Sequence, residues 1–335
     1  MTIWAVISSC EEWEEIEDFC KVNIEWFRTK AGLKLEEGVA TYHTFKRVFQ
    51  IINPEELEEC FFKWVKNIAD FTNGEIVSID GKSSRGTRDS KEKTLHLVNA
   101  WANENGLVLG QVKVDEKSNE ITAIPTLLEK LELKGCIVTI DAMGTQKDIA
   151  KIIAEENDYV LALKGNHGDL HDDVKTYFEL EKLPADISTL EKDHGRIEKR
   201  EYFLETEIDW IESKEDWANL KSIGAVVSTV VKNDKTTSET RYFISTLTDV
   251  EIFAKAVRGH WGVENSLHWV LDVTFKEDSS RMRKDFSAQN FSMLRKIAIN
   301  SLKSVESKKS INMRRKKCHY DAEFRSEVFD SVVLE

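Results

Sequence analysis

The spacing of apolar residues divides the chain into a helical start and a sheet-forming region. Within the first 70 residues, apolar side chains recur at helical intervals, as in Trp13, Ile16 and Phe19. Residues 53–56 read Asn-Pro-Glu-Glu, which favours a helix start with proline in the first turn. From Glu75 the pattern changes to short β-type runs at 76–79, 95–100 and 107–114, with Asn-Gly at 105–106 as a hairpin turn. We therefore expect a small N-terminal helical region followed by a three-strand meander.

The next part of the chain alternates between helical and extended patterns. It predicts a helix over 120–131, a strand over 137–140, a helix over 146–156 and a strand over 159–163. This alternation indicates a parallel or mixed sheet with covering helices. Residues 165–247 leave the rhythm and contain further β-type runs at 202–204, 225–231 and 242–245, so we expect a β-rich insertion. Thr248 and Glu251 have capping-box spacing, which predicts a helix from there to about Leu271.

Composition narrows the class of protein. The 335 residues include 47 Lys and Arg against 60 Asp and Glu, a formal net charge of −13, and 41% are hydrophobic, which excludes a disordered or low-complexity chain. Five scattered cysteines, none in a Cys-x-x-Cys spacing, argue against a disulfide framework and a zinc ribbon and fit a reducing cytoplasm. We find no signal peptide and no apolar run near the ~20 residues that cross a bilayer. These features predict a cytoplasmic protein without membrane contact.

Charge is distributed unevenly along the chain. Residues 1–75 hold eight Lys and Arg against fifteen Asp and Glu, whereas residues 281–317 hold twelve Lys and Arg against two acids, a local net charge of +10. A basic segment can bind a polyanion even in an acidic protein, because counterion release depends on the local charge. A solvated tail is an equally good interpretation of the same segment.

Two similar segments supply candidate catalytic acids. Ile-Val-Ser-Ile-Asp80 and Ile-Val-Thr-Ile-Asp141 each end an apolar β-type run with an aspartate. If the two strands are parallel neighbours, both carboxylates lie together at the carboxyl edge of the sheet, where open α/β folds bind ligands. Close carboxylates repel each other and attract a divalent cation, and hard oxygen ligands favour Mg²⁺ or Mn²⁺. Either aspartate taken singly could merely begin a turn, but the repetition favours a shared site.

A third acid falls within the predicted helix that starts near residue 248. Glu264 lies on the apolar stripe marked by Phe253, Trp261 and Leu267, and an unpaired core-facing carboxylate is costly. Coordination of the same cation accounts for it, and an ion pair with Arg258 is the alternative. The acids that follow closely are second-ranked candidates for the third position: Asp272, Glu277 and Asp278.

Long motifs carry a family resemblance. Five segments resemble the H-repeat-associated, ISAs-type transposases of bacterial insertion sequences, and the similarity runs nearly end to end: 77–82, 138–146, 162–166, 194–198 and 260–272. That family belongs to the DDE transposases, which have a ribonuclease-H-like core with an insertion before the final acid. The resemblance assigns Asp80 and Asp141 to the two aspartate positions, and Glu264 to the glutamate position, of the metal-binding triad.

The resemblance also implies an activity. Two Mg²⁺ ions, or Mn²⁺, held by the triad would activate water for strand cleavage at the element's ends and then activate the 3′-hydroxyl for transfer into target DNA. It implies double-stranded DNA as partner, a homodimer on DNA, and a cytoplasmic protein associated with the nucleoid when bound to DNA. Relatives usually carry an additional segment before the place of Met1, so a truncated, inactive DNA-binding remnant is the alternative function. A related structure-specific nuclease without strand transfer is a third.

One signature of the wider transposase group is only partly present. The wider group has a Tyr-Arg-Glu-Lys signature around its glutamate. In this chain Val257, His260 and Leu271 stand at the Tyr, Arg and Lys positions around Glu264. That signature handles DNA hairpin intermediates, so their occurrence here is left open. His260 could contact a phosphate or be a partly buried helix histidine. Trp261 and Trp269 have helical spacing, and we expect them in the core rather than stacked on a base.

Several further residues are candidates for DNA contact. Basic or polar side chains follow the predicted catalytic strands or lie in the insertion and the last helix, where phosphates would pass: Lys82, Arg85, Arg88, Lys164, Asn166, His167, Arg196, Arg258 and His260. For the residues after Asp80 a solvated loop is the alternative.

These inferences give an α/β fold with a ribonuclease-H-like mixed sheet and covering helices. The expected organisation is an N-terminal helical region (1–72), a catalytic core (73–164 and 248–305), a β-rich insertion before the last catalytic helix (165–247) and a basic C-terminal tail (306–335).

Overall fold

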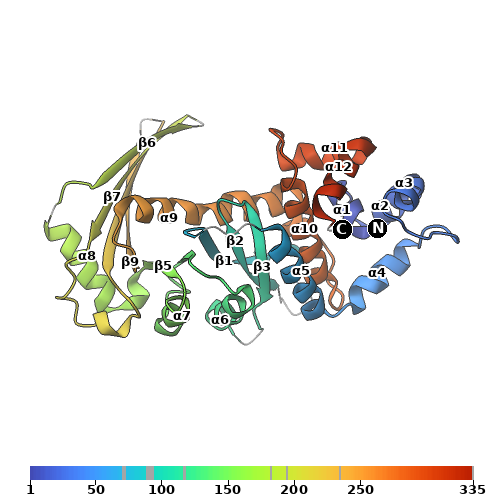
Figure 1. The fold of residues 1–335 in the computed structure, drawn as a ribbon. Helices are drawn as coiled ribbons and strands as arrows, with labels where there is room; N and C mark the ends of the chain where they lie inside the picture. Colours follow the sequence, from blue (N-terminus) through green and yellow to red (C-terminus); the bar gives the residue numbers. More distant parts are fainter. Residues whose placement is uncertain are drawn as a thin grey trace. The chain divides into compact units, whose positions relative to one another are not determined.

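The structure, a computed structural model, describes residues 1–69, 73–87, 94–115, 118–181, 183–193, 195–233 and 235–333 (Figure 1). The chain forms two compact units. The first comprises 1–70, 81–116 and 264–335, and the second 71–80 and 117–263. The chain passes between them within one strand, after Asp80, and within one helical run, before Glu264.

The second unit is built on a mixed sheet. Parallel strands β1 (Ile76–Ser84), β4 (Ile137–Ile140) and β5 (Asp158–Leu163) are followed by the antiparallel strands β9 (Lys235–Ser245), β8 (Ser222–Lys232), β7 (Arg196–Glu205) and β6 (Ile187–Asp193). The residues of β4 and the first four residues of β1 are all buried and mostly β-branched, as is typical of parallel strands covered on both faces. With β2 (Leu95–Ala102) and β3 (Leu107–Lys113), the sheet order is β3-β2-β1-β4-β5-β9-β8-β7-β6.

The order β3-β2-β1-β4-β5 is the arrangement of a ribonuclease-H-like core, so the predicted fold class is confirmed. Helices α6 (Glu120–Leu131), α7 (Lys147–Ile153), α8 (Asp169–Glu181) and α9 (Val250–Gly262) belong to the same unit. Helix α9 packs on β4 and β5, and its fully buried Phe253 joins a core with Ile76, Ile137 and Phe243. A Cβ added at Gly224 of β8 would lie 2.3 Å from Phe253 Cζ, so this contact requires glycine.

The first unit is mainly helical. It contains α1 (Thr2–Ile7), α2 (Trp13–Val22), α3 (Ile24–Thr29), α4 (Tyr42–Ile51), α5 (Pro54–Ile68), α10 (Ser287–Lys303), α11 (Ile311–Tyr320) and α12 (Ala322–Val332), together with β2 and β3. Helix α10 is almost completely buried and contacts α1, α4, α5 and β3. The ring of Trp13 meets Phe291 of α10 edge to face at 5.4 Å, which joins the N-terminal helices to the centre of this unit.

Several predicted elements are confirmed at their boundaries. The side chain of Asn53 accepts a hydrogen bond from the Glu55 amide at 2.9 Å, and Pro54 is the first residue of α5. The hairpin between β2 and β3 closes with Ala102 opposite Leu107 and with Gly106 at φ +65°, a conformation that glycine adopts without strain.

The predicted cap of the last catalytic helix is wrong by one residue. The side chain of Asp249, not of Thr248, accepts hydrogen bonds from the amides of Glu251 and Ile252, because an aspartate carboxylate caps these amides well. Helix α9 ends at Gly262 and continues as two π-helical segments, Val263–His268 and Val270–Thr274, so the helical run extends past the predicted end near Leu271.

Two further segments differ from expectation. The insertion adds its strands β6–β9 to the edge of the same sheet, and it also contains α8, which the sequence pattern did not predict. Residues 306–335 were expected as a basic tail, but the described part, 306–333, contains α11 and α12 within the first unit. Among the described helices, none is long and apolar enough to cross a membrane.

Candidate active site

The two candidate aspartates follow paired residues of neighbouring strands. Strands β1 and β4 are parallel, as predicted, and Ile79 is in register with Ile140, so Asp80 and Asp141 occupy the next position on each strand. Their surroundings differ in one respect. Asp141 follows the last residue of β4, whereas β1 continues to Ser84, which places Asp80 inside a strand rather than at its end.

Asp141 is held by the turn that it begins. Its Oδ1 accepts hydrogen bonds from the amides of Met143 and Gly144 at 3.0 and 3.1 Å. A Cβ at Gly144 would lie 2.4 Å from Ile140 Cγ2, so the turn packs tightly on the end of β4. Since both amides reach the same oxygen, Oδ2 can face a cation while the carboxylate orientation stays fixed. The turn interpretation and the ligand interpretation of Asp141 are therefore compatible.

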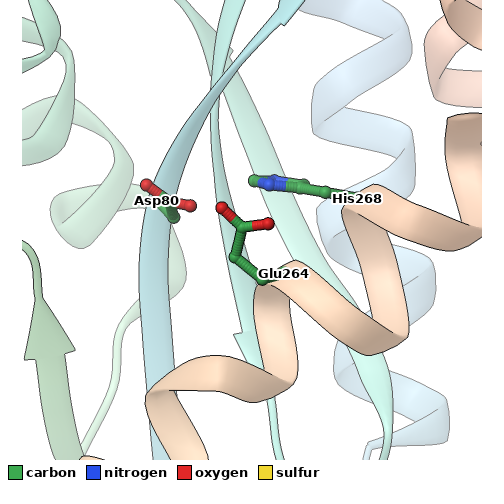
Figure 2. A group of neighbouring side chains, drawn as sticks. All are labelled: Asp80, Glu264 and His268. Carbon is green, nitrogen blue, oxygen red and sulfur yellow. The ribbon is translucent and has the colours of Figure 1, made fainter. Parts of the chain in front are cut away.

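A second group combines one residue of strand β1 with two residues of the helical run. Ligand atoms of Asp80, Glu264 and His268 all lie within 4.8 Å of one another. Figure 2 shows the Glu264 carboxylate directed toward Asp80 on the strand, with the His268 ring beside it from the same helical run. Glu264 and His268 both belong to the π-helical segment Val263–His268. Such segments are rare and often occur at functional sites.

His268 is a residue that sequence reasoning missed. It lies four residues after Glu264, and side chains at this spacing share one face of a helix. That spacing was the available signal, within a motif that the family resemblance already contained. The group is suited to a divalent cation, because carboxylates are preferred by Mg²⁺ and Mn²⁺ and imidazole suits transition metals. Asp141 is not part of this three-residue group.

A chain of hydrogen bonds ties helix α9 to the strands below the two aspartates. Thr139 Oγ1 is 3.1 Å from Ser78 Oγ and 2.9 Å from His260 Nδ1, and Ser78 Oγ donates to the Gly259 carbonyl at 3.4 Å. Since the Thr139 hydroxyl donates to Ser78, we assign Nδ1 of His260 as the donor to Thr139. His260 is thus engaged within the protein, and its predicted phosphate contact stays a prediction.

The electrostatic state of His260 follows from its surroundings. Burial lowers the pKa of His260 to about 4, although the nearby Asp141 carboxylate raises it in part, and Arg241 lowers it further. The ring is therefore neutral at pH 7, which agrees with its role as a hydrogen-bond donor to a hydroxyl.

The loop after β5 stabilises the turn at Asp141. Asn166 Nδ2 donates to the Ala142 carbonyl at 3.0 Å, and His167 Nε2 lies 3.1 Å from the Thr145 carbonyl. The amide of Lys164 donates to His167 Nδ1 at 3.1 Å, which holds the other side of this ring. Both side chains line a cavity of about 700 Å³ within the second unit. The structure thus gives Asn166 and His167 local partners, and their DNA contacts stay predictions.

The predicted arginines have acidic partners. Arg258 lies 3.4 Å from Glu191 of β6 and Arg196 lies 3.4 Å from Glu198. Within the same cluster, the buried Arg200 contacts Glu198 at 2.5 Å and Glu191 at 3.1 Å, and its hydrogen bond lowers the pKa of Glu191. Arg258 therefore pairs with the insertion, rather than with Glu264 as the alternative interpretation supposed.

The remaining candidates divide into exposed and buried groups. The Arg85 side chain is 86% exposed, and Arg88 lies outside the described residues. Lys164 is exposed, whereas Lys82 is buried against the second-ranked acids Asp272, Glu277 and Asp278.

The expectation that two tryptophans belong to the core is wrong. Trp269 is 58% exposed, and Trp261 is 39% exposed with Arg241 over its ring at 4.7 Å. Trp261 is in the last turn of α9, and Trp269 lies between the two π-helical segments.

Comparisons with known proteins show which family the chain resembles. The model of the "Transposase DDE domain" family matches residues 72–301, and a model described as "DDE_Tnp_1-associated" matches residues 1–65. "Putative transposase YncI" of Escherichia coli O157:H7 is 40% identical over 99% of this chain and 88% of its own length. "H repeat-associated putative transposase YhhI" of Escherichia coli K12 is 38% identical over 90% of this chain and 83% of its own length.

A solved structure is similar at greater distance. The chain titled "Cryo-EM structure of piggyBac transposase synaptic complex with hairpin DNA (SNHP)" aligns with a TM-score of 0.47 and 11% identity, covering 100% of this chain and 76% of that chain. A likeness this distant does not bear on the site.

Proposed function

The chain belongs to the transposase DDE domain family, and from that premise we propose that it cleaves DNA strands at the ends of an insertion sequence and joins the freed 3′-hydroxyl groups to target DNA. The observation that supports the proposal is the pairing of Ile79 with Ile140, the residues that directly precede Asp80 and Asp141 on two parallel strands. The grouping of Asp80 with Glu264 supports the third position of the triad.

Each residue has a distinct role in this proposal. Asp80, Asp141 and Glu264 would hold divalent metal ions, Mg²⁺ or Mn²⁺, and His268 would be an additional nitrogen ligand. When bound, the metal would lower the pKa of the attacking water or 3′-hydroxyl and neutralise charge on the leaving oxygen. The turn amides fix the Asp141 carboxylate before DNA arrives, so little reorganisation accompanies binding.

DNA binding in this proposal uses charges around the acids. Arg85 and Lys164 are exposed and are the best placed of the predicted phosphate contacts, and Arg85 also lies 3.7 Å from Asp278. Arg196 and Arg258 would reach phosphates only by sharing or leaving their glutamate partners. Assembly as a homodimer on DNA is part of the proposal that rests on the family resemblance.

The first test is cleavage and joining of labelled DNA that carries the element's own ends. We expect products with Mg²⁺ or Mn²⁺ and a loss of at least about 100-fold in Glu264→Gln, because removal of a metal ligand acts on the chemical step. The matched control is Glu155→Gln, which changes an exposed glutamate in a turn and leaves the rate unchanged. DNA binding without products in the unchanged protein would contradict the proposal and favour a catalytically inactive DNA-binding protein.

A further inference from the structure

Lys82 is a buried cation two residues after Asp80. Its side chain is 8% exposed, and its Nζ donates to Asp272 Oδ1 at 2.6 Å. The same ammonium lies 3.7 Å from Asp278 and 4.0 Å from Glu277. A lysine surrounded in this way by three carboxylates is poorly placed to bind a DNA phosphate, which disfavours the predicted contact.

The spacing of these partners relates them to the catalytic acids. Residues two apart on a strand face the same side, so Asp80 and Lys82 project from β1 together. Glu264 and Asp272 lie eight residues apart on one helical run, in its two π-helical segments. The Lys82–Asp272 ion pair therefore joins the strand, two residues after Asp80, to the helical run, eight residues after Glu264.

Backbone contacts hold the next residues of the same segment. The Arg85 amide donates to Asp278 Oδ1 at 3.0 Å, and Arg283 Nε donates to the Gly86 carbonyl at 2.9 Å. A Cβ at Gly86 would lie 2.3 Å from the Ser280 carbonyl oxygen, so the two backbones are packed closely. The end of β1 is thus fixed against residues 277–283 by contacts on both sides of Lys82.

Residues of α10 contact Glu277, one of the acids around Lys82. Glu277 is 2% exposed, accepts a hydrogen bond from Ser292 at 2.8 Å and lies 3.6 Å from Arg295. Burial raises the pKa of Glu277, but the cations Lys296, Arg295 and Lys82 outweigh it and lower that pKa overall. Glu277 thus stays ionised, and the charges facing Lys82 are part of a packed network rather than a solvated cluster.

We propose that Lys82 is a positioning residue for the metal-binding acids: its ion pair with Asp272 anchors the end of the strand that carries Asp80 to the helical run that carries Glu264. The inference rests on the proposed function, because it assumes that these acids bind the cation. A positioning role affects metal binding, whereas a DNA-contact role affects DNA binding. Loss of the ion pair loosens the metal ligands and leaves the phosphate contacts in place.

The test measures Mn²⁺ binding to the full-length protein by isothermal titration calorimetry, and DNA binding in EDTA over a range of salt. We expect Lys82→Met and Asp272→Asn each to weaken Mn²⁺ binding roughly 10- to 100-fold, the range found when supporting partners of metal ligands are removed. The double variant should be no weaker than the worse single variant, because both changes break one ion pair. Lys82→Arg, which keeps the charge, should restore part of the affinity.

The controls separate the possible outcomes. Lys113→Met, at the exposed end of β3, should leave Mn²⁺ binding unchanged. If Lys82→Met does not fold, Asp272→Asn still tests the pair, since Lys82 keeps Asp278 and Glu277 nearby. Normal Mn²⁺ binding in both variants would overturn the inference. It would also be overturned if the dependence of DNA affinity on salt concentration fell in Lys82→Met by the amount expected for about one lost phosphate contact.

Comparison with Glu264→Gln distinguishes failure of this inference from failure of the proposed function on which it rests. If Glu264→Gln loses Mn²⁺ affinity and Lys82→Met does not, the role of Lys82 is wrong and the proposed function stands. If neither variant changes Mn²⁺ binding, the acids do not form the metal site and both proposals fail.

Discussion

At the scale of single residues, the candidate site combines positions that the sequence could and could not reveal. The aspartates repeat within one five-residue pattern, and Glu264 interrupts an apolar stripe, so each stands out from its surroundings. His268 does not, because its motif contains several other polar residues. The partner of Lys82 is 190 positions away, so only the fold identifies it.

The hydrogen bonds of Thr139 give a prediction about stability. Thr139→Val keeps the shape of the side chain but removes the hydroxyl between Ser78 and His260. We expect the free energy of unfolding to fall by about 1–3 kcal/mol, because buried polar groups then lose a partner. Urea denaturation measures this, and Thr240→Val, at an exposed position of β9, is the control. An unchanged unfolding midpoint in Thr139→Val would show that the hydrogen bonds contribute nothing net.

The low pKa of His260 gives a prediction about pH. The pKa is about 4 in the folded protein against 6.5 for an ordinary histidine, so the unfolded chain binds the proton more readily. Stability from the neutral ring is therefore complete above pH 6.5 and decreases as pH falls toward 4. Urea unfolding in EDTA between pH 7 and 5 should show a smaller pH-dependent loss in His260→Gln than in the unchanged protein. Equal losses would place the His260 pKa near its ordinary value.

At the scale of elements, buried strands were the most predictable feature. The predicted strand over 137–140 coincides with β4. A continuous run of β-branched residues favours a strand that is buried on both faces of a sheet. Helix α8 was missed because only Leu170 and Val174 of its thirteen residues are buried, which leaves a weak apolar period. The π-helical segments were missed because their side chains continue an apolar stripe that an α-helix would also produce.

The corrected cap of α9 can be tested directly. Asp249→Ala removes the acceptor for two amides, so we expect the free energy of unfolding to fall by about 1 kcal/mol. Thr248→Ala, at the position that the sequence pattern favoured, should cost less. Urea unfolding of the two variants, measured in parallel, decides between the positions. A larger loss in Thr248→Ala would restore the capping box predicted from sequence.

At the scale of the whole molecule, ion pairs between residues distant in sequence determine whether a basic residue is buried in the fold or exposed to solvent. The basic run at 314–317 was compatible with a solvated tail or a DNA contact, yet Arg315 is 2% exposed. Its guanidinium contacts Glu11 at 2.6 Å and donates to the carbonyls of Val6 and Thr274. The two ends of the chain thus meet within the first unit, and no local pattern predicts a pairing across about 300 residues.

The ion pair between Arg315 and Glu11 predicts that Arg315 stabilises the fold and that its neighbour Lys316 does not. Arg315→Met leaves the partly buried Glu11 without its closest cation, and breaking a buried ion pair typically costs about 3–5 kcal/mol. Lys316→Met changes an exposed side chain and should leave the unfolding midpoint within experimental error. Urea unfolding followed by tryptophan fluorescence is a suitable measurement, because Trp4 and Trp13 lie in the same unit. If Arg315→Met unfolds like the unchanged protein but binds DNA less tightly, the basic run acts on DNA and the ion pair with Glu11 is dispensable for the fold.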